Sequence, residues 1–184
     1  MSDVLDVVVI VGSLRKGSHT RRFANALIGV APASMKLEIV PIADLPLYNE
    51  DLESDLPPAW RGFRERVARC HAVLFATPEY NRSVPGGLKN AIDVASRPYG
   101  QSVWDKKPAA VVSASPGAIG GFGSNQHLRQ SLVFLNMPAM QQPEAYIGGV
   151  DKLLDANGGF ASDGTKKFAT TIMTTFEGWI RRNR

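Results

Sequence analysis

The sequence predicts an α/β protein built on a doubly wound parallel sheet, and three observations support this prediction. Short apolar runs rich in Val, Ile and Ala alternate with segments whose apolar residues recur at helical spacing, the pattern of a parallel sheet covered on both faces. The chain of 184 residues has the length of one ordinary domain. Its composition, 44% hydrophobic and 21% charged, excludes the disordered, collagen-like and coiled-coil classes. We therefore expect residues 1–184 to form a single domain.

Each expected strand is a short run of apolar residues. The ranges are Val7–Val11, Leu37–Ile42, Val73–Thr77, Ala109–Ala114 and, less well defined, Glu144–Ile147. The strands of a sheet that is buried on both faces are near-continuously apolar, so such runs indicate parallel rather than half-exposed antiparallel strands.

The expected helices carry apolar residues three and four positions apart, which gives each an apolar face. Their ranges are Ser18–Val30, Pro58–Cys70, Gly86–Ser96, Gly123–Leu135 and Gly164–Arg182. Five strands and five helices in this order predict a flavodoxin-like fold with helices on both faces of the sheet. The two long connections, 44–57 and 148–159, are the expected places of mobility or partner contact. Ligands of such sheets bind beyond the carboxyl ends of the strands, so functional residues are expected after the first, third and fourth strands.

Charge and composition narrow the class of ligand. The net charge of +4 lacks the one-sided basic stripe of a nucleic-acid-binding protein, which favours a small-molecule ligand. A single cysteine, Cys70, cannot form an internal disulfide, and it has no metal-ligand spacing with the three histidines. The acidic start Met1–Asp6 is unlike a signal peptide, and no apolar run approaches the roughly 18 residues of a membrane span. We expect a cytoplasmic protein with no membrane span and no metal.

The loop after the first strand, Gly12–Arg21, is rich in hydroxyl groups and positive charge. Backbone amides at the start of the following helix, together with hydroxyl groups and an arginine, suit a phosphate group. The candidate phosphate-binding residues are Ser13, Arg15, Ser18 and Thr20. In the alternative interpretation Ser18 only caps the helix and the glycines only form the turn.

The type of phosphate follows from what this loop lacks. Ser18 and His19 stand where a Walker loop requires Lys followed by Ser or Thr, so a nucleoside triphosphatase is not expected. The dinucleotide fingerprint is also absent, because four residues separate Gly12 from Gly17. A single phosphate, as in flavin mononucleotide (FMN), fits best.

The loop after the third strand carries the most specific pattern, TPEYNRSVPGGLKNAID at residues 77–93. This segment closely resembles the NAD(P)H-dependent FMN reductase family, in particular its bacterial branch described as quinone and chromate reductases. The turn Gly12–Arg15 and the segment His127–Gln130 match the same family in the same order, so the resemblance spans most of the chain. It implies a flavodoxin-like flavoenzyme.

The resemblance also implies roles for single residues. Pro78, Glu79, Tyr80 and Asn81 would border the flavin ring, with the backbone near Glu79 and Asn81 forming hydrogen bonds to it. Arg82 and Ser83 would lie on the substrate side, where Arg82 would favour NADPH or anionic acceptors. Taken alone, Tyr80 would be a half-buried packing residue and Glu79 a solvated carboxylate.

The loop after the fourth strand, Ser113–Gly123, has little side-chain bulk. By resemblance, Ser115 and Gly117 would line the other edge of the flavin. The alternative is that these glycines form only a flexible connection.

Spacing excludes two hydrolytic classes. No serine lies in a Gly-x-Ser-x-Gly elbow, so an α/β-hydrolase has no nucleophile here. Low-molecular-weight tyrosine phosphatases need an arginine six residues after the cysteine, whereas Ala76 stands there after Cys70. We expect Cys70 to be a packed thiol. We expect His127 to serve the core or an interface rather than catalysis.

The family resemblance implies an oxidoreductase that binds FMN noncovalently. Hydride would pass from NADH or NADPH to flavin N5 and then to a quinone, with chromate and azo compounds as further acceptors and no catalytic side chain. It also implies a homodimer or homotetramer, with Arg97, Tyr99, Arg129 and Glu144 as candidate interface residues. Two alternatives remain open, a flavodoxin-like electron carrier that docks on a redox partner and a flavin-free regulatory protein.

Overall fold

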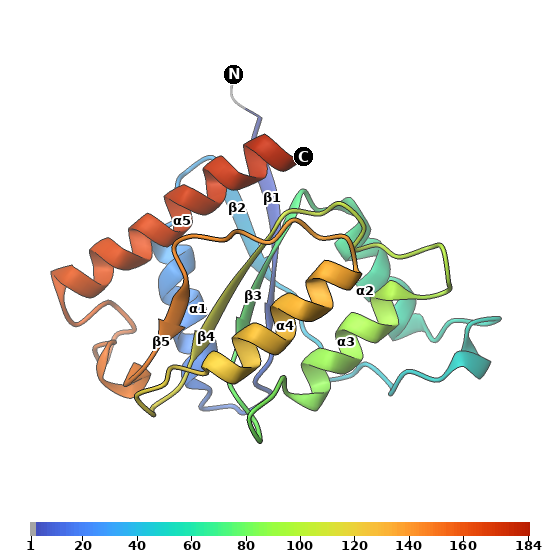
Figure 1. Cartoon of the computed structure of the whole chain (residues 1–184), viewed down its shortest axis with the longest axis horizontal. Helices are drawn as coiled ribbons and strands as arrows, with labels where there is room; N and C mark the ends of the chain where they lie inside the picture. The colour runs from blue at the N-terminus through green and yellow to red at the C-terminus, as the bar shows by residue number, and fades with distance from the viewer. Residues whose placement is uncertain (1–2) are drawn as a thin grey trace.

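The computed structural model describes residues 3–184, which contain a five-stranded parallel sheet in the order β2-β1-β3-β4-β5 (Figure 1). The strands are β1 (Leu5–Val11), β2 (Met35–Ile39), β3 (Ala72–Thr77), β4 (Ala109–Ala114) and β5 (Ala145–Ile147). This order is that of the flavodoxin-like sheet, with the reversal of strand order between β1 and β3. The predicted fold class is confirmed.

Five α-helices cover the two faces of the sheet. They are α1 (His19–Gly29), α2 (Pro58–Arg69), α3 (Gly86–Ser96), α4 (Phe122–Phe134) and α5 (Asp163–Asn183), with short 3-10 turns at η1 (Glu50–Leu52) and η2 (Val150–Lys152). Helices α1 and α5 pack on one face, and α2, α3 and α4 pack on the other.

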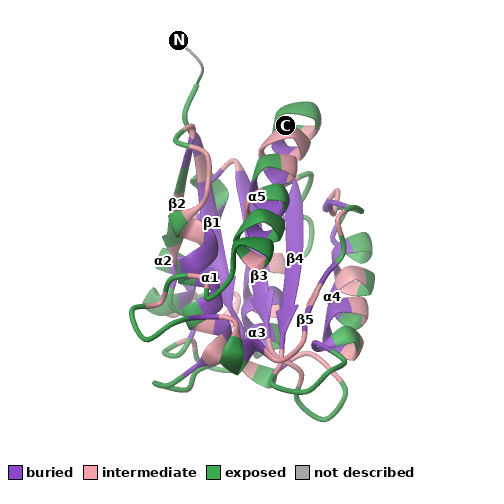
Figure 2. Cartoon of the chain, turned by 90° about the vertical axis from the view of Figure 1, so that its left-hand side faces the viewer, coloured by how far each residue is buried: buried purple, intermediate pink, exposed green. Residues whose placement is uncertain are grey.

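Alternating residues of β1, an inner strand paired on both sides, point into the two cores. In β1, Val7 and Val9 face α1 and α5, whereas Val8 and Ile10 face the opposite helices. All four side chains are fully buried. The strands β1, β3 and β4 accordingly form a largely buried layer between helices that expose only their outer sides, whereas the edge strand β2 is partly exposed (Figure 2). This two-sided burial explains why the strands read as continuous apolar runs in the sequence.

The largest error in the sequence-based boundaries concerns β2, which was expected at 37–42. The strand instead begins at Met35, opposite Leu5, and its ladder ends at Ile39. The amide of Val40 still donates to Val9 O at 3.0 Å, but Pro41 has no N–H with which to continue. The ends of the other strands and of the helices lie within two residues of the expected positions.

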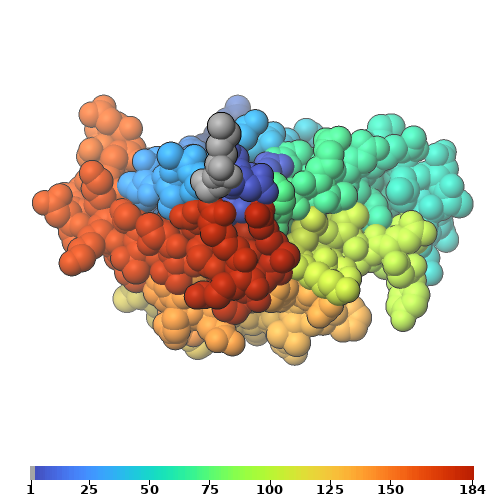
Figure 3. Space-filling model, turned by 90° about the horizontal axis from the view of Figure 1, so that it is seen from above, coloured from blue at the N-terminus to red at the C-terminus, as the bar shows by residue number. Residues whose placement is uncertain are grey.

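The loops after β1, β3 and β4 gather at one end of the sheet, the lower edge in Figure 1. The opposite end is covered in part by α5, which lies across it in the view from above (Figure 3). The carboxyl-terminal part of α5, where Glu177 accepts a hydrogen bond from Ser34 just before β2, is therefore remote from the loops that carry the predicted site. None of the helices in residues 3–184 is both long and apolar enough to cross a bilayer.

Candidate functional site

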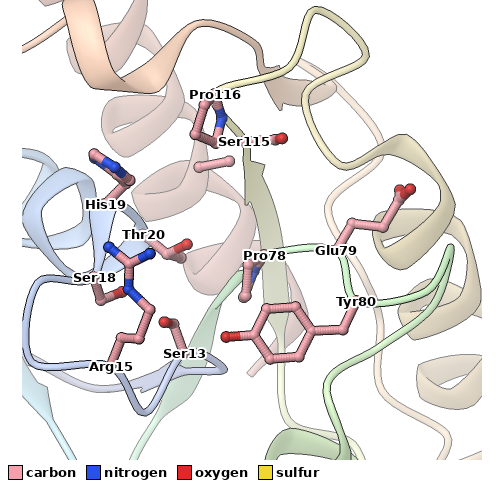
Figure 4. Close-up of a pocket in the computed structure, with 11 residues that line it drawn as sticks. Ser13, Arg15, Ser18, His19, Thr20, Pro78, Glu79, Tyr80, Ser115 and Pro116 are labelled. Carbon is pink, nitrogen blue, oxygen red and sulfur yellow. The ribbon is translucent and has the colours of Figure 1, made fainter.

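A cavity of about 180 Å³ lies where the loops after β1, β3 and β4 meet (Figure 4). Its lining residues come from all three loops. They are Ser13, Arg15, Ser18, His19, Thr20, Pro78, Glu79, Tyr80, Ala114, Ser115 and Pro116. The cavity therefore lies where a doubly wound sheet places its ligand, outside the carboxyl ends of the strands.

Gly12 allows the first and third loops to approach each other closely. A Cβ atom at this position would lie 3.1 Å from Leu88 Cδ2 and 3.3 Å from Pro78 Cδ. Both distances are shorter than ordinary carbon–carbon contacts, so a side chain here would push the two loops apart. The glycine thus shapes the wall that the two loops share.

Ser18 caps helix α1. Its Oγ accepts a hydrogen bond from the amide of Arg21 at 3.0 Å, and the residue is buried. The capping interpretation is therefore confirmed. It does not conflict with phosphate binding, because the cap uses the hydroxyl oxygen as an acceptor and leaves its proton free to donate.

The hydroxyls of Ser13 and Thr20 lie in the cavity without a protein partner. Both residues are only 4% exposed, yet no hydrogen bond joins either hydroxyl to another atom of residues 3–184. The amides of His19 and Thr20, the first two of helix α1, also donate to nothing in that range. Among the described residues no fully buried side-chain polar atom lacks a partner, so these two hydroxyl oxygens open onto the cavity rather than being sealed from solvent, and a helix N-terminus favours an anion. These groups fit the phosphate of FMN.

The charge around this loop is positive. Arg15 lines the cavity, and its Nη2 donates to Gly17 O at 2.8 Å within the same turn. No Asp or Glu occurs between Asp6 and Glu38 in the sequence. Electrostatic attraction therefore supports an anionic ligand at the start of α1.

The loop after β3 is a tight hairpin. Tyr80 and Ser83 exchange two backbone hydrogen bonds of 3.0 Å, and Asn81 and Arg82 between them have φ angles of +49° and +67°. Two consecutive left-handed residues are typical of a type I′ turn, in which Asn is favoured and Arg is strained. The turn presents Tyr80 to the cavity, with its hydroxyl directed toward the first loop (Figure 4).

The carboxylate of Glu79 points away from the residues of the first loop (Figure 4). It accepts a hydrogen bond from the amide of Ser124 at 3.2 Å and forms an ion pair with Arg82 Nη1 at 3.0 Å. The amides of Glu79 and Asn81 donate to no acceptor in residues 3–184. Within the described residues these two amides remain available to a ligand, whereas the Glu79 carboxylate is already engaged by Ser124 and Arg82.

The loop after β4 is packed against β5. The amide of Ser115 donates to Ile147 O at 2.9 Å, and Gly120 has a φ of +66°. A Cβ at Gly120 would lie 2.5 Å from the carbonyl carbon of Tyr146. This glycine is therefore required by protein packing, and the loop is not merely a flexible connection. At Gly117 the same Cβ would meet only Ser115 Oγ, at 3.5 Å.

Tyr146 supports this loop from behind. Its hydroxyl accepts a hydrogen bond from Gln126 Nε2 at 2.6 Å, and its ring packs edge-on against Phe122 at a centroid distance of 5.1 Å. Burial and the nearby Glu144 carboxylate raise the pKa of the Tyr146 hydroxyl. The phenol therefore stays protonated at neutral pH and acts as a structural group.

A second cavity of about 210 Å³ adjoins the first. Its lining residues are Glu79, Arg82, Ser115, Gly117, Ala118, Ile119 and Gly121. Glu79 and Ser115 line both cavities, which places them at the boundary between the two.

The structure brings most of the predicted site residues together. The first cavity contains Ser13, Arg15, Ser18, Thr20, Pro78, Glu79, Tyr80 and Ser115, and the second contains Arg82 and Gly117. Asn81 and Ser83 line neither cavity. The prediction omitted His19, Ala114 and Pro116, although the position of His19 directly after the Ser18 cap was a usable signal.

His127 and Cys70 both lie outside the two cavities. The imidazole Nδ1 of His127 lies 2.9 Å from Ser83 Oγ, and the residue is exposed. Of the two expected roles, core or interface, the exposed position excludes the core, because α4 buries Leu128 and Leu132 instead, and the interface role stays a prediction. Cys70 is buried as expected, and burial raises the pKa of its thiol.

The fold and the cavity define a flavodoxin-like protein whose cavity gathers hydroxyl, amide and guanidinium donors suited to a phosphate. Comparison with known families makes this specific, since residues 5–152 match the model described as NADPH-dependent FMN reductase. The chain belongs to this family.

Individual relatives are similar along their whole length. A quinone reductase of Pseudomonas putida is 60% identical over 185 residues, which cover 100% of this chain and 99% of the relative. A 2-hydroxy-1,4-benzoquinone reductase of a Burkholderia species is 44% identical, with 98% of each chain covered. Among solved structures, FerB, a flavoenzyme NAD(P)H:(acceptor) oxidoreductase from Paracoccus denitrificans, superposes with a TM-score of 0.94 at 40% identity, covering 98% of this chain and 99% of FerB.

Membership of this family confirms the class of chemistry implied by the sequence motifs. The chain is an oxidoreductase that uses FMN, with a nicotinamide nucleotide as its co-substrate.

Proposed function

We propose that this protein is an FMN-dependent NAD(P)H:quinone oxidoreductase. The observation that carries the proposal is the pair of hydroxyls with no partner in residues 3–184, that of Ser13 in the loop after β1 and that of Thr20 at the start of α1, in a cavity that Pro78 and Tyr80 also line. The quinone reductase of Pseudomonas putida and the benzoquinone reductase of the Burkholderia species support quinones as the acceptor class.

The first loop holds the cofactor without a covalent bond. The hydroxyls of Ser13, Ser18 and Thr20 donate to the phosphate, Arg15 adds charge, and the first amides of α1 complete the anion site. FMN, once bound, supplies hydride transfer through N5. The residues of the chain orient it and exclude water.

The third and fourth loops receive the ring. We assign the contacts to the Pro78–Asn81 backbone on one side and to Ser115 and Gly117 on the other. Pro78 and the type I′ turn make the first of these walls rigid. The small residues of the other loop let backbone approach the ring closely.

Arg82 and Ser83 lie on the acceptor side in this proposal. Arg82 would favour NADPH and anionic acceptors, a preference that the Glu79 carboxylate 3.0 Å away weakens, and chromate and azo compounds are additional acceptors. A comparison of wild type with Arg82→Ala, using NADH and NADPH against a neutral quinone and chromate, tests this assignment. Unchanged ratios between all four combinations would remove Arg82 from substrate selection.

The oxidoreductase and the electron carrier differ in one measurement. We expect anaerobic addition of NADPH to bleach the yellow holoprotein rapidly, and a quinone to restore its colour. The Thr171→Ala variant, altered on the exposed side of α5, should behave like wild type. Slow bleaching in the presence of tightly bound FMN would favour the electron carrier, and failure to bind FMN would favour the flavin-free protein.

We further propose a homodimer or homotetramer in the cytoplasm. Val133 and Phe134 on α4 are 77% and 89% exposed, and Phe134 borders a groove of about 340 Å³ between α3 and α4. An exposed aromatic side chain beside a groove suits a symmetric interface in which Phe134 of each copy enters the groove of the other copy. Sedimentation of wild type and Phe134→Lys tests this, since an unchanged assembly would exclude the face.

The four candidate interface residues differ in what they contact within the chain. Arg97 Nε already donates to Glu53 at 2.8 Å, and Arg129 donates to Asn125 Oδ1 and to Met140 O, each at 2.9 Å. Tyr99 is 88% exposed. Its ring is therefore more available for a partner than the side chains of Arg97 and Arg129, and Glu144 is exposed as well.

A further inference from the structure

The loop after β3 is attached to one face of helix α4. Thr77 Oγ1 lies 2.9 Å from Ser124 Oγ, the amide of Ser124 donates to Glu79 at 3.2 Å, and Ser83 Oγ lies 2.9 Å from His127 Nδ1. Ser124 and His127 are three residues apart and share a face of the helix. The segment assigned to the flavin ring is therefore positioned by α4 as well as by β3.

Glu79 supplies the negative charge that the N-terminus of α4 lacks. The N-cap Gly121 forms no side-chain cap, and the first turn contains no acidic residue. The carboxylate of Glu79 accepts from Ser124, at the third position of the helix, and so acts as a cap from another segment of the chain.

Arg82 and Gly123 fix the position of this carboxylate. Arg82 Nη1 lies 3.0 Å from Glu79 Oε1. A Cβ at Gly123 would lie 2.8 Å from Arg82 O and 3.0 Å from Glu79 Oε2, so the helix start and the hairpin are in direct contact. The arrangement holds Arg82 in a left-handed conformation that Arg adopts at a cost.

The pair lies at the boundary between the two cavities. The Glu79 side chain is 14% exposed and lines both cavities, whereas the Arg82 side chain is 71% exposed and lines the second. A charge in the wall of a ligand cavity acts on a bound redox group through a medium that is less polar than bulk water. A carboxylate opposes the addition of electrons, and a guanidinium favours it.

We propose that Glu79 is a positioning residue for the flavin loop, and that the Glu79–Arg82 pair balances the charge that the flavin meets when it is reduced. The inference rests on the proposed function, because it takes FMN as the ligand of this cavity. It assigns two separable roles to Glu79: the hydrogen bond to Ser124 holds the loop, and the negative charge sets the reduction potential.

Variants of the holoprotein separate these roles. Glu79→Gln keeps an oxygen acceptor for Ser124 but removes the charge, so we expect a more positive FMN midpoint potential and an FMN Kd within about threefold of wild type. Arg82→Gln leaves the carboxylate unbalanced and should make the potential more negative. The double variant should return close to the wild-type potential. Glu79→Ala removes both roles and should weaken FMN binding by about tenfold.

Glu177→Gln is the matched control. Glu177 also pairs with an arginine, Arg181, at 2.8 Å, but it lies on α5 at 22% side-chain exposure. Its variant should keep the wild-type potential. Shifts of the same sign in Glu79→Gln and Arg82→Gln, or shifts no larger than in the control, would overturn the inference. If Glu79→Ala does not fold, the signs of the potential shifts in Glu79→Gln and Arg82→Gln still test the inference, which requires them to be opposite. Failure of the proposed function is separate, because wild type would then not bind FMN.

Discussion

Asn90 Oδ1 accepts a hydrogen bond from the backbone amide of Tyr48 at 2.8 Å, which joins helix α3 to the long connection between β2 and α2. The same side chain donates from Nδ2 to the carbonyls of Leu45 and Pro46, at 3.2 and 3.1 Å. The connection was expected to be a place of mobility or partner contact. One accepted and two donated hydrogen bonds of this buried side-chain amide instead fix the first half of the connection to the helix that follows the loop after β3.

Replacing Asn90 with Ala should therefore destabilise the protein. The variant loses three hydrogen bonds and leaves buried backbone groups without partners, which costs about 2–3 kcal/mol in the free energy of unfolding. Urea denaturation measures this change. Asn25→Ala, at an exposed position of α1, is the control and should change the free energy by less than about 0.5 kcal/mol. Equal effects of the two variants would contradict the assignment.

Arg64 caps the end of helix α3 from helix α2. Its Nη1 donates to the carbonyls of Val94, Ala95 and Arg97, and its Nη2 donates to Gln101 O at 2.8 Å, while α3 has no basic residue in its own last turn. We expect Arg64→Met to lower the free energy of unfolding by about 3 kcal/mol, because buried carbonyls lose their donors. Arg64→Lys should recover part of this loss. A loss below about 1 kcal/mol in the Met variant would show that water replaces the guanidinium.

Ser13 and Thr20 should contribute to FMN binding and little to folding. Neither hydroxyl has a partner in residues 3–184, so Ser13→Ala and Thr20→Val should leave the thermal midpoint of the apoprotein nearly unchanged. Each should weaken FMN binding by about tenfold, since each removes a donor to a charged phosphate. Fluorescence titration gives the Kd and calorimetry gives the Tm. Strong destabilisation of both apoproteins would show that the hydroxyls have a structural role.

Two glycines of the loop after β4 should differ in their effect on stability when they are replaced by alanine. Gly120→Ala forces a Cβ to within 2.5 Å of the Tyr146 backbone at a positive φ, so we expect a loss of at least about 2 kcal/mol in stability. Gly117→Ala has room for its Cβ and should fold like wild type, with its effect confined to FMN affinity. Thermal unfolding of the two apoproteins distinguishes them. Equal Tm values would contradict this division.

Protonation of Glu53 should contribute to the loss of stability of the folded protein at acidic pH. Hydrogen bonds from Arg97 Nε at 2.8 Å and Tyr48 Oη at 2.7 Å hold the pKa of this carboxyl below its ordinary value. A lowered pKa adds stability above the ordinary carboxyl value, and this stability is lost as the pH falls through the folded-state pKa. The Tm gap between wild type and Glu53→Gln should be constant from about pH 6 to 8 and narrow below about pH 4.5. A gap that widens on acidification would reverse the sign and refute the assignment.

Much of the fold could be predicted from the sequence because the apolar pattern follows directly from burial. Strand β4 and helix α3 occur within their expected limits, since strong apolar runs end at clear Pro and Gly signals there. Strand β2 was displaced because its burial alternates at a sheet edge, where the register opposite β1 decides the limits. Register is a long-range property that a local pattern does not contain.

The site was predictable where the residue type itself carries the chemistry, as in the hydroxyls of Ser13 and Thr20. The prediction was weaker where the contact is made by another part of the chain. The carboxylate of Glu79 caps α4, whose first turn lies more than forty residues away in sequence. No local pattern indicates this partner. Only the structure shows that the side chain of Glu79 contacts α4 while its backbone amide has no partner in residues 3–184.

The most direct test compares FMN with riboflavin, which has the same ring but no phosphate. If the loop after β1 grips the phosphate, wild-type apoprotein should bind FMN at least about a hundredfold more tightly than riboflavin, through several charge-assisted hydrogen bonds. The double variant Ser13→Ala, Thr20→Val should lose most of this difference while its riboflavin affinity stays the same. Equal affinity of the wild type for the two ligands would contradict the account.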